Sequence, residues 1–174
     1  MATKWQRIRI DLPKTYDSTE RLAIGQEIID QIQKRTEQGK DKKGIPFIEY
    51  SEAYKNSLNF KIGGKSKSKV NLRLSGDMMA ALKIINEAPG SVTVGFENGT
   101  EDNGKADGNI RGTYGSPSPK KGKARDFLGI QPSEKTKILN RFPLRDRERS
   151  KLKAEEIVSV GDAAKAFIDA TSEE

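Results

Sequence analysis

The sequence contains no cysteine and no histidine. Without cysteine the chain has no disulfide bond and no thiolate metal site. Without histidine it lacks the commonest general base and metal ligand, so a nucleophile–base pair would need a lysine or a carboxylate as its base. We expect a protein that is not an enzyme, with no cofactor and no metal, and a small enzyme that uses carboxylates stays as a third hypothesis.

Long apolar runs are also missing. No stretch of about 18 apolar residues, the length of a membrane-spanning helix, occurs, and the N-terminus lacks the apolar core of a secretory signal. Hydrophobic residues make up 33% of the 174 residues, which is low for a compact globule. We expect a soluble protein of a reducing cytoplasm without a membrane partner. Its one small core is completed by partner subunits or accompanied by long exposed segments.

Charge is abundant, with 32 lysines and arginines against 25 acidic residues and a net charge of +7. The basic excess lies mainly at 61–69, 120–125 and 135–153. A basic balance permits contact with DNA or with an acidic partner without requiring either.

The stretch 69–96 is the predicted centre of the fold. Val70, Leu72 and Leu74 alternate with polar residues, which predicts a half-buried strand. A capped apolar turn over 75–82 follows, then an extended segment from Lys83. The segment 87–91 contains Pro-Gly and predicts a turn, and 91–96 alternates as a further strand.

Two elements are predicted before this centre. Residues 8–12 alternate as an edge strand with Arg7 and Arg9 facing outward. A helix from Asp17 to about Gln38 has capping-box spacing at its start and a plausible C′ glycine at its end. Its predicted buried stripe is Ile24, Ile28, Ile29 and Ile32, and the residues placed outside the stripe are Glu27, Gln31, Lys34 and Arg35.

The remaining segments are shorter. We expect an extended segment over 45–50, a helix over 52–58, an exposed linker over 59–68 and at most one helical turn within 105–115. An apolar island at 124–130 precedes a helix over 134–140, and a last helix spans about 153–170. The predicted fold is α+β, a small mainly antiparallel sheet packed against a long N-terminal helix. Residues 1–142 form this domain, and 143–174 form a charged C-terminal extension with a helix.

Site motifs are weak. Gly64-Lys65-Ser66 lacks the preceding glycine of a phosphate-binding loop, because Asn59 stands there. The segment from Asn103 to Tyr114 lacks the ligands of a calcium loop. Glu49 and Glu52 could share a face, but in a chain with 25 acidic residues a solvated pair is the expected reading.

The order of the motifs resembles the virion-morphogenesis, or tail-completion, proteins of tailed bacteriophages. The resemblance covers about residues 17–140. It rests on a Leu-Ser-Gly-Asp-Met segment, a Val-Gly strand end, a glycine-rich loop and an Arg-x-Phe-Leu-Gly island. The matching positions are Leu74, Ser75, Gly76, Asp77, Met78, Val94, Gly95, Gly112, Gly115, Arg125, Phe127, Leu128 and Gly129.

The resemblance implies a structural neck protein in the virion, assembled in the host bacterial cytoplasm. It would form a ring with copies of itself, of six subunits or alternatively twelve. Its partners would be portal or head-closure proteins on one side and tail-terminator or tail-tube proteins on the other. Double-stranded DNA would pass through the lumen without sequence readout.

In this reading the island docks either on its own sheet or on the next subunit, with Arg125 orienting it by pairing with a carboxylate. The expected subunit or partner contacts are Arg125, Phe127, Leu128, Ile130 and Trp5, and the expected structural turn glycines are Gly76, Gly95, Gly112 and Gly115. The alternative is a basic nucleic-acid-binding protein, whose charge clusters lie near Lys67, Lys121 and Arg147.

Overall fold

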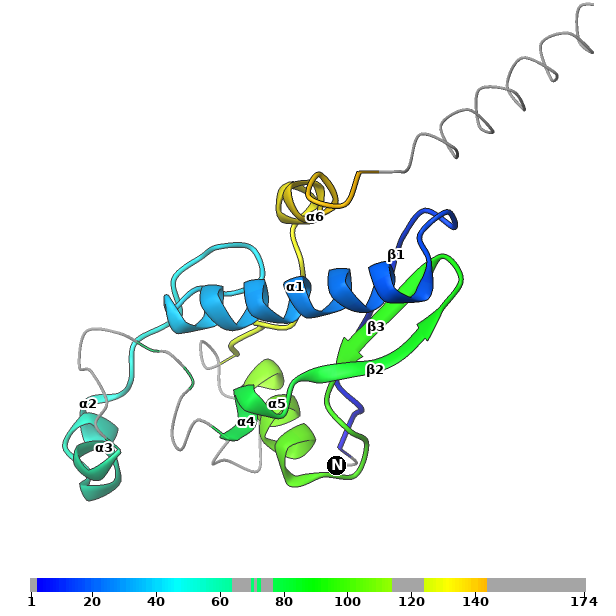
Figure 1. The fold of residues 1–174 in the computed structure, drawn as a ribbon. Coiled ribbons are helices and arrows are strands. Elements are labelled where there is room, and N and C mark those ends of the chain that lie inside the picture. The colour runs from blue at the N-terminus through cyan, green and yellow to red at the C-terminus, as the bar shows by residue number, and fades with distance from the viewer. Residues whose placement is uncertain (1–2, 64–69, 71, 73–76, 114–123, 144–174) are drawn as a thin grey trace, which may run out of the picture. The chain divides into compact units, whose positions relative to one another are not determined.

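The structure is a computed structural model that describes residues 3–63, 70, 72, 77–113 and 124–143. A small antiparallel sheet packs against one long helix, with shorter helices around them (Figure 1), which confirms the predicted α+β class. Met1–Phe142 forms one compact unit. The helix predicted over 153–170 lies outside the described residues.

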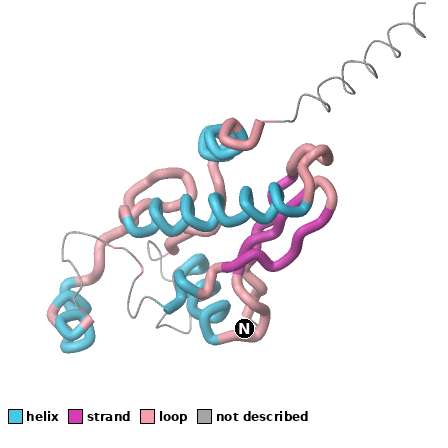
Figure 2. Tube along the Cα trace, in the orientation of Figure 1, coloured by secondary structure: helices cyan, strands magenta, loops and turns pink. Residues whose placement is uncertain are grey.

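The sheet has three strands in the order β1-β3-β2, and both pairings are antiparallel. The strands are β1 (Arg7–Asp11), β2 (Lys83–Ala88) and β3 (Ser91–Gly95), drawn in magenta in Figure 2. The edge position of β1 and the outward arginines are confirmed, since Arg7 and Arg9 are exposed. The predicted Pro-Gly turn joins β2 to β3, and Gly90 there has φ 81°, a conformation that favours glycine.

Helix α1 (Ser18–Glu37) is the long N-terminal helix. Asp17 caps it by accepting a hydrogen bond from the Glu20 amide at 2.9 Å, and the Glu20 carboxylate accepts one from the Asp17 amide at 3.0 Å. This is the predicted capping box. Gly39, the predicted C′ residue, has φ 79°.

Helix α1 lies across the sheet (Figure 1) and buries the predicted isoleucine stripe against it. Ile24, Ile28 and Ile32 are each fully buried. A methyl group added at Gly25 would come within 2.9 Å of both Ile84 Cδ1 and Val92 Cγ2. The glycine therefore permits the close approach of helix and sheet, a role that the isoleucine pattern did not predict.

The first strand predicted in the central stretch is not present at its two described positions. Val70 and Leu72 are buried as expected, but neither belongs to a strand. Leu72 has φ 54°, which is left-handed and incompatible with extended backbone. Leu74 lies outside the described residues. The capped apolar turn is observed as α4 (Asp77–Ala80).

The segment after Tyr50 forms two short helices where one helix and an exposed linker were predicted. These are α2 (Glu52–Lys55) and α3 (Leu58–Ile62). Ser57 separates them, and its hydroxyl accepts a hydrogen bond from the Phe60 amide at 3.2 Å. Phe60 is 3% exposed because its ring packs against Tyr50 and Tyr54. The linker prediction is therefore wrong in its backbone for residues 59–62, which belong to α3, and wrong in exposure for Phe60, whereas Lys61 and Ile62 are exposed as predicted.

Helix α5 (Glu101–Arg111) has 11 residues, whereas at most one turn was predicted. Its glycines lower helix propensity, but tertiary contacts compensate. The Gln6 amide donates to Asn103 Oδ1 at 2.8 Å, and the Gln6 side chain donates to Asp107 Oδ1 at 2.8 Å. These buried bonds fix α5 to the chain just before β1.

Helix α6 (Pro132–Leu139) begins two residues earlier than predicted, with Gln131 as its N-cap residue. Proline is favourable in the first turn, where its missing N–H has no helical partner. The Glu134 carboxylate accepts a hydrogen bond from the Gln131 amide at 2.9 Å.

Candidate subunit-contact surface

The apolar island docks on its own chain, which was one of the two predicted alternatives. Phe127 is fully buried, and its ring meets that of Phe96 edge to face at 6.3 Å between centroids. Leu128 is 5% exposed. The Arg125 amide donates to the Asn109 carbonyl at 2.8 Å, which fixes the start of the island to the end of α5. Phe127 and Leu128 are therefore core residues of this subunit.

Arg35 holds the end of the island in place. Its Nη2 donates to the Phe127 carbonyl at 3.0 Å and to the Gly129 carbonyl at 2.6 Å, while Nη1 pairs with Glu134 Oε2 at 2.6 Å. Arg35 was predicted to lie outside the buried stripe of α1, and this prediction is wrong because the residue is 4% exposed. A guanidinium can satisfy several acceptors at once, which makes its burial tolerable here.

Glu134 is the acidic partner of Arg35. Burial alone would raise the pKa of its carboxyl group, but three hydrogen bonds, from the Gln131 amide, the Gln31 side chain and Arg35, lower the pKa below its ordinary value. The carboxylate therefore stays charged in the folded protein at neutral pH and joins α1 to α6.

Arg125 has a different partner from the one predicted. Its guanidinium lies over the Tyr50 ring at 5.3 Å, a cation–π contact. No carboxylate of the described residues pairs with it. Burial lowers the pKa of Arg125, and the neighbouring Tyr50 partly opposes that shift. The island is thus oriented by an aromatic ring and by Arg35 rather than by an ion pair of Arg125.

Trp5 lies half-buried just before β1. Its indole Nε1 donates to the Phe96 carbonyl at 2.7 Å, and the Arg7 guanidinium lies 3.8 Å from the ring centroid. These contacts leave part of the ring at the surface. Its assignment as a subunit contact remains a prediction.

The predicted turn glycines divide into three cases. Gly112 ends α5 with φ 73°, as a turn glycine should. Gly95 is in β3 rather than in a turn, and it is required because an added methyl group would lie 2.6 Å from the Gln6 carbonyl oxygen. Gly76 and Gly115 lie outside the described residues.

Four large apolar side chains are exposed within a short stretch of the chain. Ile45 and Ile48 are 57% and 56% exposed, and Leu58 and Ile62 are 69% and 75% exposed. Leu58 and Ile62 are four residues apart on α3, so they share one face of that helix. We call the surface formed by Leu58 and Ile62 the α3 face. The sequence did not predict it.

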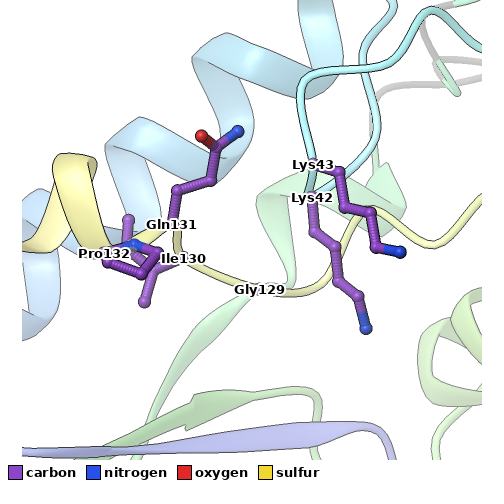
Figure 3. Close-up of a pocket in the computed structure, with 6 residues that line it drawn as sticks. All are labelled: Lys42, Lys43, Gly129, Ile130, Gln131 and Pro132. Carbon is purple, nitrogen blue, oxygen red and sulfur yellow. The ribbon is translucent and has the colours of Figure 1, made fainter.

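A pocket of about 360 Å³ lies beside the island. Ile130, the fourth predicted contact residue, lines it. The other lining residues are Lys42, Lys43, Gly129, Gln131 and Pro132. In Figure 3 the two lysine side chains run along one side of Gly129, with Ile130 and Pro132 on the other.

Glu49 and Glu52 are the acidic pair that the sequence placed on one face. Glu49 and Glu52 have side chains 75% and 81% exposed, and both pair with Lys55, as expected of a solvated pair. Acidic side chains in the described ranges form no group of three or more that could hold a metal ion. None of the described helices combines the length and apolar character needed to cross a membrane.

The basic clusters near Lys67, Lys121 and Arg147 lie outside the described residues. Comparison with known proteins gave no match: no family model, no curated protein and no solved structure resembles the chain closely enough to identify it.

Proposed function

We propose that the chain is a non-catalytic structural subunit of the bacteriophage head–tail junction. Six copies, or alternatively twelve, assemble into a ring between the portal or head-closure protein and the tail-terminator or tail-tube protein. Double-stranded DNA passes through the lumen without sequence readout. The protein is assembled in the host cytoplasm and resides in the virion.

The motif positions behind the resemblance occupy structural places in the fold, which supports this reading. Gly95 permits close strand pairing, Gly112 ends α5, Phe127 fills the core and Gly129 accepts a hydrogen bond from Arg35. These residues stabilise the subunit. A structural protein is expected to use its motifs in this way.

The observation that carries the proposal is the set of exposed apolar side chains between Ile45 and Ile62. Leu58 and Ile62 share one face of α3, so their exposed apolar surface is contiguous, and Ile45 and Ile48 expose further apolar side chains in the same stretch of the chain. At about 25 cal/mol per Å², covering such a surface contributes several kcal/mol before the entropy of association is subtracted. A contact between different surfaces of successive copies closes into a ring.

Electron micrographs of the purified full-length protein test the proposal. The expected end-on class averages show closed rings with a central channel at least as wide as duplex DNA. Antibody labelling of the corresponding virions should place the protein between head and tail. Single chains in the micrographs together with unlabelled virions would contradict the proposal.

Nucleic-acid binding is kept as a second candidate because of one feature of the sequence. Residues 64–69 and 114–123 hold six lysines and no acidic residue. On either side of 114–123 the chain is bonded to the last turn of α5. The Thr113 amide donates to the Gly108 carbonyl and the Arg125 amide donates to the Asn109 carbonyl, both at 2.8 Å. A duplex-DNA gel shift at moderate salt tests this candidate. It predicts binding that falls steeply with salt, and an unshifted band at moderate salt would remove it.

A further inference from the structure

The pocket beside the island is a built feature of the fold. The turn over Asp41–Ile45 is closed by a hydrogen bond from the Asp41 amide to the Ile45 carbonyl at 2.8 Å. The Lys42 amide donates to the Asp126 carbonyl, also at 2.8 Å, which attaches this turn to the island. A methyl group added at Gly129 would lie 2.9 Å from Lys42 Cδ. The aliphatic part of Lys42 therefore packs on Gly129 and forms part of the pocket wall.

The two lysines that line the pocket differ in their partners. The Lys42 ammonium group pairs with Asp126 Oδ2 at 2.6 Å, so its charge is compensated. Lys43 is exposed, and within the described ranges its side chain has no acidic partner. One ammonium group without an acidic partner thus lines the pocket across Gly129 from Ile130 and Pro132 (Figure 3). The nearest carboxylate on its own turn, that of Asp41, accepts hydrogen bonds from the Lys43 and Ile45 amides.

We infer that this pocket binds an acidic segment of a partner protein, in which a carboxylate is adjacent to an apolar side chain. The carboxylate pairs with Lys43, and the apolar side chain packs against Ile130 and Pro132. Duplex DNA fits this pocket less well, because binding to its phosphates depends on several cations and makes no use of the apolar side chains that line the pocket. The inference goes beyond ring assembly and does not depend on it.

Peptide selection on the immobilised full-length protein tests the inference. A random-peptide display library should yield peptides in which Asp or Glu lies next to Leu, Ile or Phe. Fluorescence anisotropy of one selected peptide should show binding about tenfold weaker for Lys43→Glu, because attraction at the pocket becomes repulsion. Lys14→Glu is the matched control, since Lys14 is an exposed lysine away from the pocket lining, and it should change binding less than twofold.

Three results would overturn the inference. One is a selection in which no peptide is enriched over a control selection on the support without protein. Another is a set of selected peptides without acidic residues. The third is an equal loss of binding in the Lys43→Glu and Lys14→Glu variants, which would reflect net charge rather than a site. Repeating the selection on Lys43→Glu sharpens the test, because the inference expects acidic peptides to be lost and basic ones to replace them.

Discussion

Helices α1 and α3 carry the same local pattern and use it in opposite ways. Each places large apolar residues four positions apart, Ile24, Ile28 and Ile32 on α1 and Leu58 and Ile62 on α3. On α1 these residues are fully buried, whereas on α3 they are 69% and 75% exposed. The spacing decides which residues share a face, but only packing decides whether that face is covered. On α1 the sheet covers it, and on α3 a second copy does so in our proposal.

The largest effect is expected at the end of α1 that lies against the island. Arg35→Met should lower the free energy of unfolding by about 3–5 kcal/mol, because it leaves the Glu134 carboxylate without its cationic partner and two island carbonyls without their donor. Chemical denaturation followed by circular dichroism measures this. Lys34→Met removes an exposed cation from the same helix and should cost under about 0.5 kcal/mol. Equal losses in the two variants would contradict the assigned role of Arg35.

The next largest effect is the loss of stability when a side chain is truncated on the buried face of α1, compared with the same truncation on the α3 face. Ile28→Ala removes a fully buried side chain and should cost about 2–5 kcal/mol. Ile62→Ala should change the stability of the dissociated subunit by less than about 0.5 kcal/mol. Urea denaturation of the two variants at low protein concentration makes the comparison. A large loss in Ile62→Ala would show that the α3 face is buried within the subunit.

A smaller effect concerns pH. The folded pKa of Glu134 is lowered, so its contribution to stability is complete above the unfolded pKa of about 4.3 and is lost as pH falls through the folded value. Glu134→Gln should cost about 1.5–3 kcal/mol at pH 7.

Thermal melts from pH 7 to pH 3 test this expectation. The stability difference between wild type and Glu134→Gln should narrow as the pH falls below about 4.3. A stability difference that stays constant across this pH range would mean that the charge of Glu134 does not contribute to stability.

The sequence predicted those elements whose local signals agree with their packing. The capping box at Asp17, the isoleucine stripe of α1 and the Pro-Gly turn before β3 were all predicted, because each signal lies within a few residues of the feature that it specifies. Helix α5 was missed because its glycines argue against a helix, while the bonds from Gln6 that support it come from almost one hundred positions away. Long-range contacts of this kind override propensity.

The candidate site was predicted less completely for a related reason. Phe127 and Leu128 were recognised as buried area, but the island pattern could not say on which chain they dock. Arg35 looked like a solvated residue because its partners, the island carbonyls and Glu134, are distant in sequence. The α3 face was missed because the glycine, lysine and serine residues after Asn59 suggested a linker. In the structure the Ser57 hydroxyl accepts a hydrogen bond from the Phe60 amide at the start of α3, and the Phe60 ring packs against Tyr50.

The most direct test of the account is the molar mass of the full-length protein and its Leu58→Ser/Ile62→Ser variant, measured by light scattering at matched concentrations. The account predicts six times the mass of one chain for the wild type, or twelve times, and the mass of a single chain for the variant, with little change in subunit stability. Leu22→Ser, which alters an exposed apolar residue of α1, should keep the wild-type mass. A wild type that has the mass of one chain at every concentration, or a variant that assembles as the wild type does, would contradict the claim that the α3 face is a contact between copies.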